Sequence, residues 1–154
     1  MVRLIEFAET RSDIKNGLKQ NRDEFIFHLL KLFYHPECDS RNGWEITVYK
    51  QYRRVSLLKK SNKLPDSSFI YEYILGEYED RIDEYIIQDI DDMNDEYDQV
   101  PIITDYAIND AISYLKDYTK WLSNQLSRNG KININDVRSK ISELLTKYNR
   151  NGIK

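Results

Sequence analysis

The chain has 154 residues, with 23 lysines and arginines against 26 aspartates and glutamates, so its formal net charge is only −3. Its single cysteine, Cys38, excludes an internal disulfide framework, and no apolar run approaches the roughly 20 residues of a membrane span. These features predict a cytoplasmic protein with no membrane segment, folded as a single domain over residues 1–154.

Turn-forming residues are scarce, with five glycines and three prolines in the whole chain. Long stretches rich in isoleucine, leucine, lysine and acids separate these few breakers, which favours helices over the many short strands of a sandwich or barrel. We therefore predict an all-α fold, a helical bundle of about five helices.

The opening "VRLIEFAE" fits either a short strand or an extended arm. A first helix is predicted from Ser12 or Asp13, either of which can cap it, to Tyr34, because Pro36 stops helical geometry just beyond. Its expected apolar stripe is Ile14, Leu18, Phe25, Leu29, Leu32 and Phe33.

After a loop that contains Asn42-Gly43, a second helix is predicted from Trp44 to about Lys60. Its apolar stripe is Trp44, Val48, Tyr52, Val55 and Leu58. Cations gather on its back and just beyond its end: Lys50, Arg53, Arg54, Lys59, Lys60 and Lys63. Such a face can contact phosphate, but a solvated face, or pairing with the acidic helix that follows, is the favoured interpretation because no groove-reading motif accompanies it.

Asp66 or Ser67 can cap a third helix, whose stripe would be Ile70, Ile74, Tyr78, Arg81/Ile82 and Tyr85. Beyond Ile86 this pattern fails, since Ile87 and Ile90 fall outside the stripe. Either the helix ends there or a second surface covers these residues, and the polar "DDMNDEYDQVP" is predicted to be a loop.

Thr104 or Asp105 is predicted to start a fourth helix with the cleanest stripe of the chain: Ala107, Ala111, Leu115, Tyr118, Leu122 and Leu126. Asn133 or Asn135 is predicted to cap a fifth helix, with Gly152 just past its end. Its stripe is Val137, Ile141, Leu144, Leu145 and Tyr148.

The stretch "HLLKLFYHPECDSRNGWEITVYKQYRRVSLL" carries a recognisable motif. The matching positions are His28, Leu29, Leu30, Lys31, Tyr34, Pro36, Glu37, Ser40, Arg41, Trp44, Thr47, Val48, Gln51, Arg53 and Arg54. With the helix that follows, about residues 28–89, this stretch resembles family 29 of the domains of unknown function. The resemblance implies an all-helical fold and brings no activity with it.

Side chains that can bind metals or act as nucleophiles cluster near the first loop: His28, His35, Glu37, Cys38 and Asp39. A zinc site would need a second Cys/His pair at matching spacing, and a Cys-His catalytic pair would need a third orienting group. The acidic "DIDDMNDEYDQV" departs from a calcium loop because Asn94 and Val100 replace the required glycine and glutamate. We therefore predict no catalytic residue, no metal and no cofactor.

The strongest feature is the acidic stretch from Glu77 to Asp98, which holds eleven acids and one arginine. Tyrosines run through and just before it, and tyrosine is favoured at protein interfaces. Ile87, Ile90 and Met93 do not fit the helix stripe and are expected to be exposed among the acids.

These observations predict a small acidic binding protein, of the inhibitor or immunity type, that captures a basic protein partner such as a nuclease toxin. The expected partner-binding residues are Glu79, Asp80, Asp83, Ile87, Ile90, Asp91, Asp92, Asp95, Glu96, Tyr97 and Asp98. The alternative is a structural or regulatory bundle that self-associates through the exposed isoleucines. A metal-dependent hydrolase built on Glu37, Asp39 and the histidines is the remaining, less favoured hypothesis.

Overall fold

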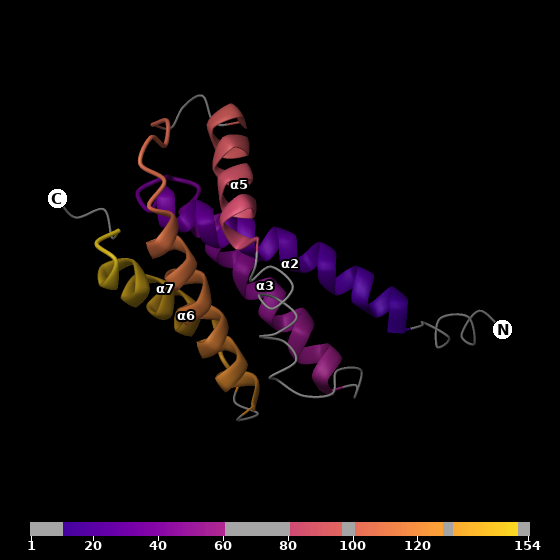
Figure 1. Ribbon diagram of the computed structural model, residues 1–154. Helices are drawn as coiled ribbons and strands as arrows, with labels where there is room; N and C mark the ends of the chain where they lie inside the picture. The colour runs from indigo at the N-terminus through magenta and orange to yellow at the C-terminus, as the bar shows by residue number, and fades with distance from the viewer. Residues whose placement is uncertain (1–10, 61–80, 97–100, 128–130, 151–154) are drawn as a thin grey trace.

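The computed structural model describes residues 11–60, 81–96, 101–127 and 131–150, and within them all side chains except those of residues 11–22, 58–60 and 127 (Figure 1). All elements of the described part of the chain are α-helices, which confirms the predicted all-α bundle. Several predicted features lie outside the described residues: the opening arm, the cap and stripe of residues 66–80, Glu79, Asp80, Tyr97, Asp98 and Gly152, and the side chains of Ile14, Leu18 and Leu58.

Helix α2 runs from Arg11 to Tyr34 and forms the centre of the bundle. It packs against α3, α5 and α6, and its buried positions follow the predicted stripe and extend beyond it: Phe25, Ile26, Leu29, Leu30, Leu32 and Phe33. A helix that is apolar around most of its circumference must be surrounded by others, which explains its central place.

Helix α3 runs from Arg41 to Lys60, three residues earlier than the predicted start at Trp44. The predicted stripe is confirmed, because Trp44, Val48, Tyr52 and Val55 are all buried. The basic back is exposed, with Lys50, Arg53 and Arg54 facing away from the core.

Helix α5 runs from Ile82 to Glu96, so the predicted loop over residues 91–101 is wrong for its first six residues. Ile82, Ile86, Ile90 and Met93 step by four, four and three, and all four are buried on one face of this helix. The prediction failed because it placed Tyr85 in the stripe. An apolar stripe that passes through Ile82 and Ile86 continues, at helical spacing, to Ile90 and Met93.

Helix α6 runs from Ile108 to Ser127, so the predicted start at Thr104 or Asp105 was too early. Ala107 has a positive φ of 42°, which no α-helix continues through. The Asp105 Oδ1 accepts a hydrogen bond from the Ala107 N–H at 3.2 Å and holds this turn ahead of the helix. Within the helix the stripe is confirmed, with Ala111, Leu115, Tyr118, Leu122 and Leu126 buried.

Helix α7 runs from Ile134 to Lys147 and begins as predicted, with Asn133 as its N-cap. Asn133 and Asp136 form a capping box, in which each side chain accepts a hydrogen bond from the backbone N–H of the other. The predicted positions Val137, Ile141, Leu144 and Leu145 are buried.

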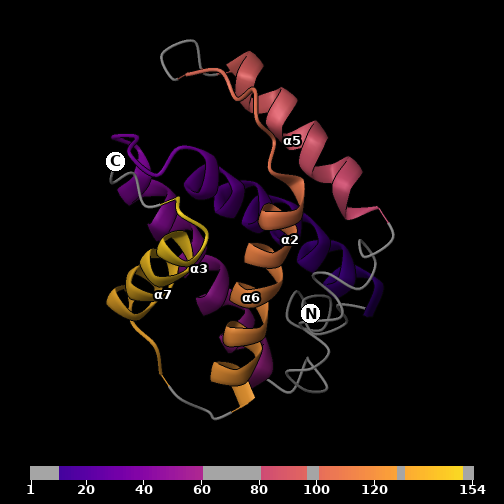
Figure 2. The ribbon, with the colours of Figure 1, turned by 60° about the vertical axis from the view of Figure 1, so that its left-hand side comes forward.

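The buried apolar side chains of all five helices form one cluster. Helix α5 packs against α2 and α6, whereas α7 packs against α3 and α6. In both ribbon views α5 lies on the far side of the bundle from α7 (Figures 1 and 2). One face of α5 is therefore turned away from the core. No helix in the described part of the chain is long and apolar enough to cross a bilayer.

Candidate functional site

The outer side of α5 carries exposed carboxylates along its length: Asp83, Glu84, Asp91, Asp92, Asp95 and Glu96. We refer to these six residues as the acidic face. The face arises from the helical repeat, because the four apolar residues occupy one side and the acids are left on the other. Of the predicted partner-binding residues, five lie on the acidic face: Asp83, Asp91, Asp92, Asp95 and Glu96.

Two predictions of exposed apolar side chains on α5 are wrong. Ile90 and Met93 are each 0% exposed, because they continue the buried stripe of the helix. Ile87 is 40% exposed, as predicted, and Tyr85 is 42% exposed. The apolar part of the proposed binding surface is therefore Ile87 with the Tyr85 ring, and Ile90 cannot contact a partner.

Within the part of the chain that the structure describes, cations neutralise little of the acidic face. Glu84 pairs with Arg81 at 3.0 Å, and both side chains of this pair are well exposed. Asp92 accepts a hydrogen bond from the neutral Gln88 amide, and Asp91 accepts one from the Tyr106 hydroxyl. The other carboxylates of the face make no ion pair within the described part of the chain.

The basic back of α3 was expected to be solvated or to pair with the acidic helix. Among the described residues, α3 packs against α2 and α7, and its one ion pair to another helix joins Glu45 to Arg138 of α7. Lys50, Arg53 and Arg54 are exposed and pair with no carboxylate of α5 in the residues that the structure covers. The two fields of opposite sign are therefore presented separately.

Asp89 lies between the acidic face and the core, where α5 meets α2. The pKa of Asp89 is raised to about 7, chiefly by burial and also by the negative charges of Asp92 and Asp23, while the nearby Lys31 ammonium opposes this rise. This carboxyl group therefore changes its charge near neutral pH, unlike an ordinary aspartate.

The segment from 101 to 107 is attached to α5 by two of its residues. The side-chain amide of Asn94 donates to the Ile103 carbonyl at 3.1 Å and accepts from the Ile103 N–H at 2.8 Å. The Tyr106 hydroxyl donates to Asp91 at 2.9 Å, and the Tyr106 carbonyl accepts a hydrogen bond from the Tyr34 hydroxyl. The segment thus connects the acidic face to the end of α2.

A cleft of about 690 Å³ lies next to this segment, bounded by the α2–α3 loop, residues 101–105 and the residues after α7. The Arg150 guanidinium carbon lies 4.7 Å from the Phe33 ring centroid and 5.5 Å from that of Tyr34, a cation–π arrangement. Burial raises the pKa of Tyr34, so its phenol stays neutral. Sequence patterns gave no indication of this cleft, because its walls come from three distant parts of the chain.

His35 and Cys38 both line the cleft, whereas His28 does not. His28 shares a hydrogen bond of 2.8 Å with the Glu24 carbonyl of its own helix, and His35 lines the cleft with no hydrogen-bond partner for its Nε2 among the described atoms. Burial lowers the pKa of both imidazoles. His35 and Cys38 meet through their backbones, where the Cys38 N–H donates to the His35 carbonyl. The described residues contain no group of three metal-binding side chains.

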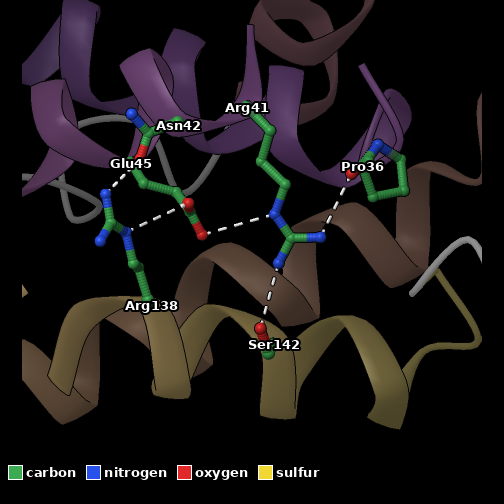
Figure 3. Close-up of polar contacts among 6 residues, drawn as sticks. All are labelled: Pro36, Arg41, Asn42, Glu45, Arg138 and Ser142. Carbon is green, nitrogen blue, oxygen red and sulfur yellow. Dashed lines mark hydrogen bonds and ion pairs between the residues drawn. The ribbon is translucent and has the colours of Figure 1, made fainter. Parts of the chain in front are cut away.

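Three charged side chains join the α2–α3 loop and α3 to α7 (Figure 3). Glu45 is buried, accepts a hydrogen bond from Arg41 at 3.4 Å and forms an ion pair with Arg138 at 3.5 Å. Arg41 also donates to the Pro36 carbonyl and to the Ser142 hydroxyl, and Arg138 donates to Asn42. This network holds the loop that forms one wall of the cleft. The i, i+4 spacing of Arg41 and Glu45 was visible in the sequence, but nothing pointed to Arg138.

No family model, curated protein or solved structure matches this chain. The resemblance of residues 28–89 to family 29 of the domains of unknown function therefore stays a prediction.

Proposed function

We propose that this protein is a binding module that captures a basic protein partner through the acidic face of α5. The observation that carries the proposal is the exposure of Asp83, Asp91, Asp92, Asp95 and Glu96 on one helix, next to the exposed Ile87 and without neutralising cations in the described structure.

The charges and the apolar contact serve different steps of binding. A coherent negative field attracts a cationic surface over a distance comparable to the Debye length and raises the association rate. Ile87 and the Tyr85 ring then supply apolar area that is buried on contact. Since α5 packs on the core through its opposite side, its outer side can meet a partner without any change in the bundle.

A nuclease toxin is the partner class that fits this chemistry best. Nucleases bind phosphates through lysines and arginines, and a row of carboxylates presents a similar array of negative charge. An inhibitor or immunity-type protein of this kind would cover the active site of the nuclease with the acidic face.

The test compares two double variants with the same change of net charge. Asp92→Lys with Asp95→Lys reverses two charges of the acidic face, whereas Glu24→Lys with Glu143→Lys reverses two exposed carboxylates on other helices. Each protein is used to capture partners from a lysate of the native host, and captured proteins are identified by mass spectrometry. We expect the wild type and the control to retain the same basic protein and the acidic-face variant to lose it.

Two results would contradict the proposal: recovery of no basic protein by the wild type, or capture that survives reversal of Asp92 and Asp95. For a captured nuclease, addition of the wild-type chain should also inhibit its cleavage of nucleic acid, and the acidic-face variant should not.

Self-association is the alternative that the exposed isoleucines suggested. Ile90 is buried, so on the described part of α5 only Ile87 remains for such a contact. Two copies of the acidic face would also repel each other. Light scattering that shows a monomer at every concentration would count against this alternative.

A further inference from the structure

The segment from 101 to 105 is bound to α5 along one of its edges. The Asn94 side-chain amide donates a hydrogen bond to the Ile103 carbonyl and accepts one from the Ile103 N–H. A residue of a neighbouring β-strand would make the same two hydrogen bonds. Figure 2 shows this segment running beside α5 before the start of α6.

Among the described residues, none is hydrogen-bonded to the backbone at the opposite edge of the segment. In an extended chain, the N–H and C=O of successive residues point to alternate edges. Because those of Ile103 point to Asn94, an extended course of the segment would direct those of Ile102 and Thr104 away from α5; both residues line the cleft. Within the described structure, the backbones of Ile102 and Thr104 make no hydrogen bond.

The side chains around this edge indicate the chemistry of a ligand. Ile102 is 70% exposed, a large aliphatic surface beside the open edge. Three exposed carboxylates line the same cleft, from Glu37, Asp39 and Asp105, against the one guanidinium of Arg150. The cleft is therefore net negative and favours a cationic chain.

We propose that the cleft binds an extended, basic segment of the partner, which pairs as an added strand with the backbone of Ile102 and Thr104. An unpaired extended edge offers hydrogen bonds to any such peptide, and the flanking side chains select its sequence. Ile102 contacts an aliphatic residue of the segment, and the rim carboxylates contact its lysines or arginines. This inference depends on the proposed function, because the segment belongs to the same basic partner. The cleft lies close to the acidic face, because Tyr106, which follows the cleft residue Asp105, donates a hydrogen bond to Asp91.

The first experiment uses a capped peptide of alternating lysine and valine residues, titrated into the full-length isotope-labelled chain. We expect the backbone amide signals of Ile102 and Thr104 to shift in proton–nitrogen spectra. A peptide with glutamate in place of lysine should leave them unchanged. Shifts confined to the amides of α5, or no shift at all, would overturn the inference.

The second experiment tests strand pairing itself. Two further lysine–valine peptides are N-methylated on alternate residues, one on the even and one on the odd positions, so that each loses the donors of one edge. Pairing predicts that one of them binds about tenfold or more weakly, the loss expected for two hydrogen bonds, while the other is unaffected. Equal affinities would overturn the inference.

A variant of the protein supplies an independent check. Thr104→Pro removes the backbone N–H of an exposed residue and should weaken binding of the unmodified peptide, with helix content unchanged by circular dichroism. Unchanged peptide binding by this variant would contradict the pairing. The proposed function fails separately, if capture of the whole partner survives reversal of Asp92 and Asp95.

Discussion

At the scale of single residues, Glu45 shows how one buried charge holds two helices together. Its carboxylate lies between the guanidinium groups of Arg41 and Arg138, which are themselves partly exposed. A buried acid with two cationic partners is stable, but removal of the acid leaves both arginines without the group that oriented them. The loop that Arg41 holds at Pro36 would lose this support as well.

Glu45→Ala is therefore expected to lower the free energy of unfolding by about 2–3 kcal/mol, because it breaks a buried ion-pair network. The matched control is Glu143→Ala, which removes an exposed carboxylate paired with Lys140 and should change stability by less than about 0.5 kcal/mol. Chemical denaturation monitored by circular dichroism measures both. Equal effects of the two variants would show that the network contributes nothing specific.

At the scale of elements, α5 has two different faces. Its apolar residues attach it to α2 and α6, while Asp89 lies at the edge of that contact, near Asp23 and Lys31 of α2 and Asp92 of its own helix. A carboxyl group in this position is more easily buried in its neutral form. The attachment of the acidic helix is consequently sensitive to pH.

Asp89 has a folded-state pKa of about 7, above the value of 3.8 for an unperturbed aspartate, so the folded chain binds its proton more tightly than the unfolded chain does. By proton linkage, the free energy of unfolding should therefore fall as the pH rises from about 4 to about 7. Above about pH 7 the stabilising contribution of the protonated Asp89 is lost in full. Asp89→Asn should remove this loss and raise the melting temperature at pH 8 by at least about 3 °C, while the difference from the wild type vanishes near pH 4.

Asp95→Asn serves as the control, since Asp95 is an exposed acid of the same helix. Thermal unfolding across the pH range compares the two variants with the wild type, so that titration of other groups, His28 and His35 included, cancels in the difference. An Asp89→Asn protein that is less stable than the wild type at pH 8 would show that the charged carboxylate is favourable here.

At the scale of the whole molecule, a net charge of −3 conceals a strong separation of charge. The acidic face lies on α5, and the exposed cations Lys50, Arg53 and Arg54 lie on α3, a helix that packs elsewhere in the bundle. Such a molecule orients a charged partner before contact, because the field near α5 is set by local charges and not by the total.

Binding of the captured partner should therefore depend on salt mainly through the association rate. Between about 0.05 and about 0.5 M salt, screening should lower that rate by about tenfold or more and change the dissociation rate much less. Surface plasmon resonance with the immobilised chain measures both rates. An association rate that does not respond to salt would place the contact outside the acidic face.

The sequence by itself determined the helices and most of their buried faces. Residue periodicity identified the stripes of α3, α6 and α7, and the side chain of Asn133 identified a cap, since these features depend on neighbours within a few positions. The acids of α5 were also recognised, because charge density is a local property. The end of that helix was misjudged through the choice of Tyr85 as a core residue.

Only the tertiary structure decided which side chains are buried and which remain exposed to a partner. It buried Ile90 and Met93, left the α5 acids without an ion pair to the α3 cations among the described residues, and brought Pro36, Ile102 and Arg150 to one cleft. Contacts of this kind join residues tens of positions apart, and the choice among them depends on how whole helices pack. Local patterns fix which side of a helix is apolar, but the packing of the other helices fixes what remains exposed for a partner.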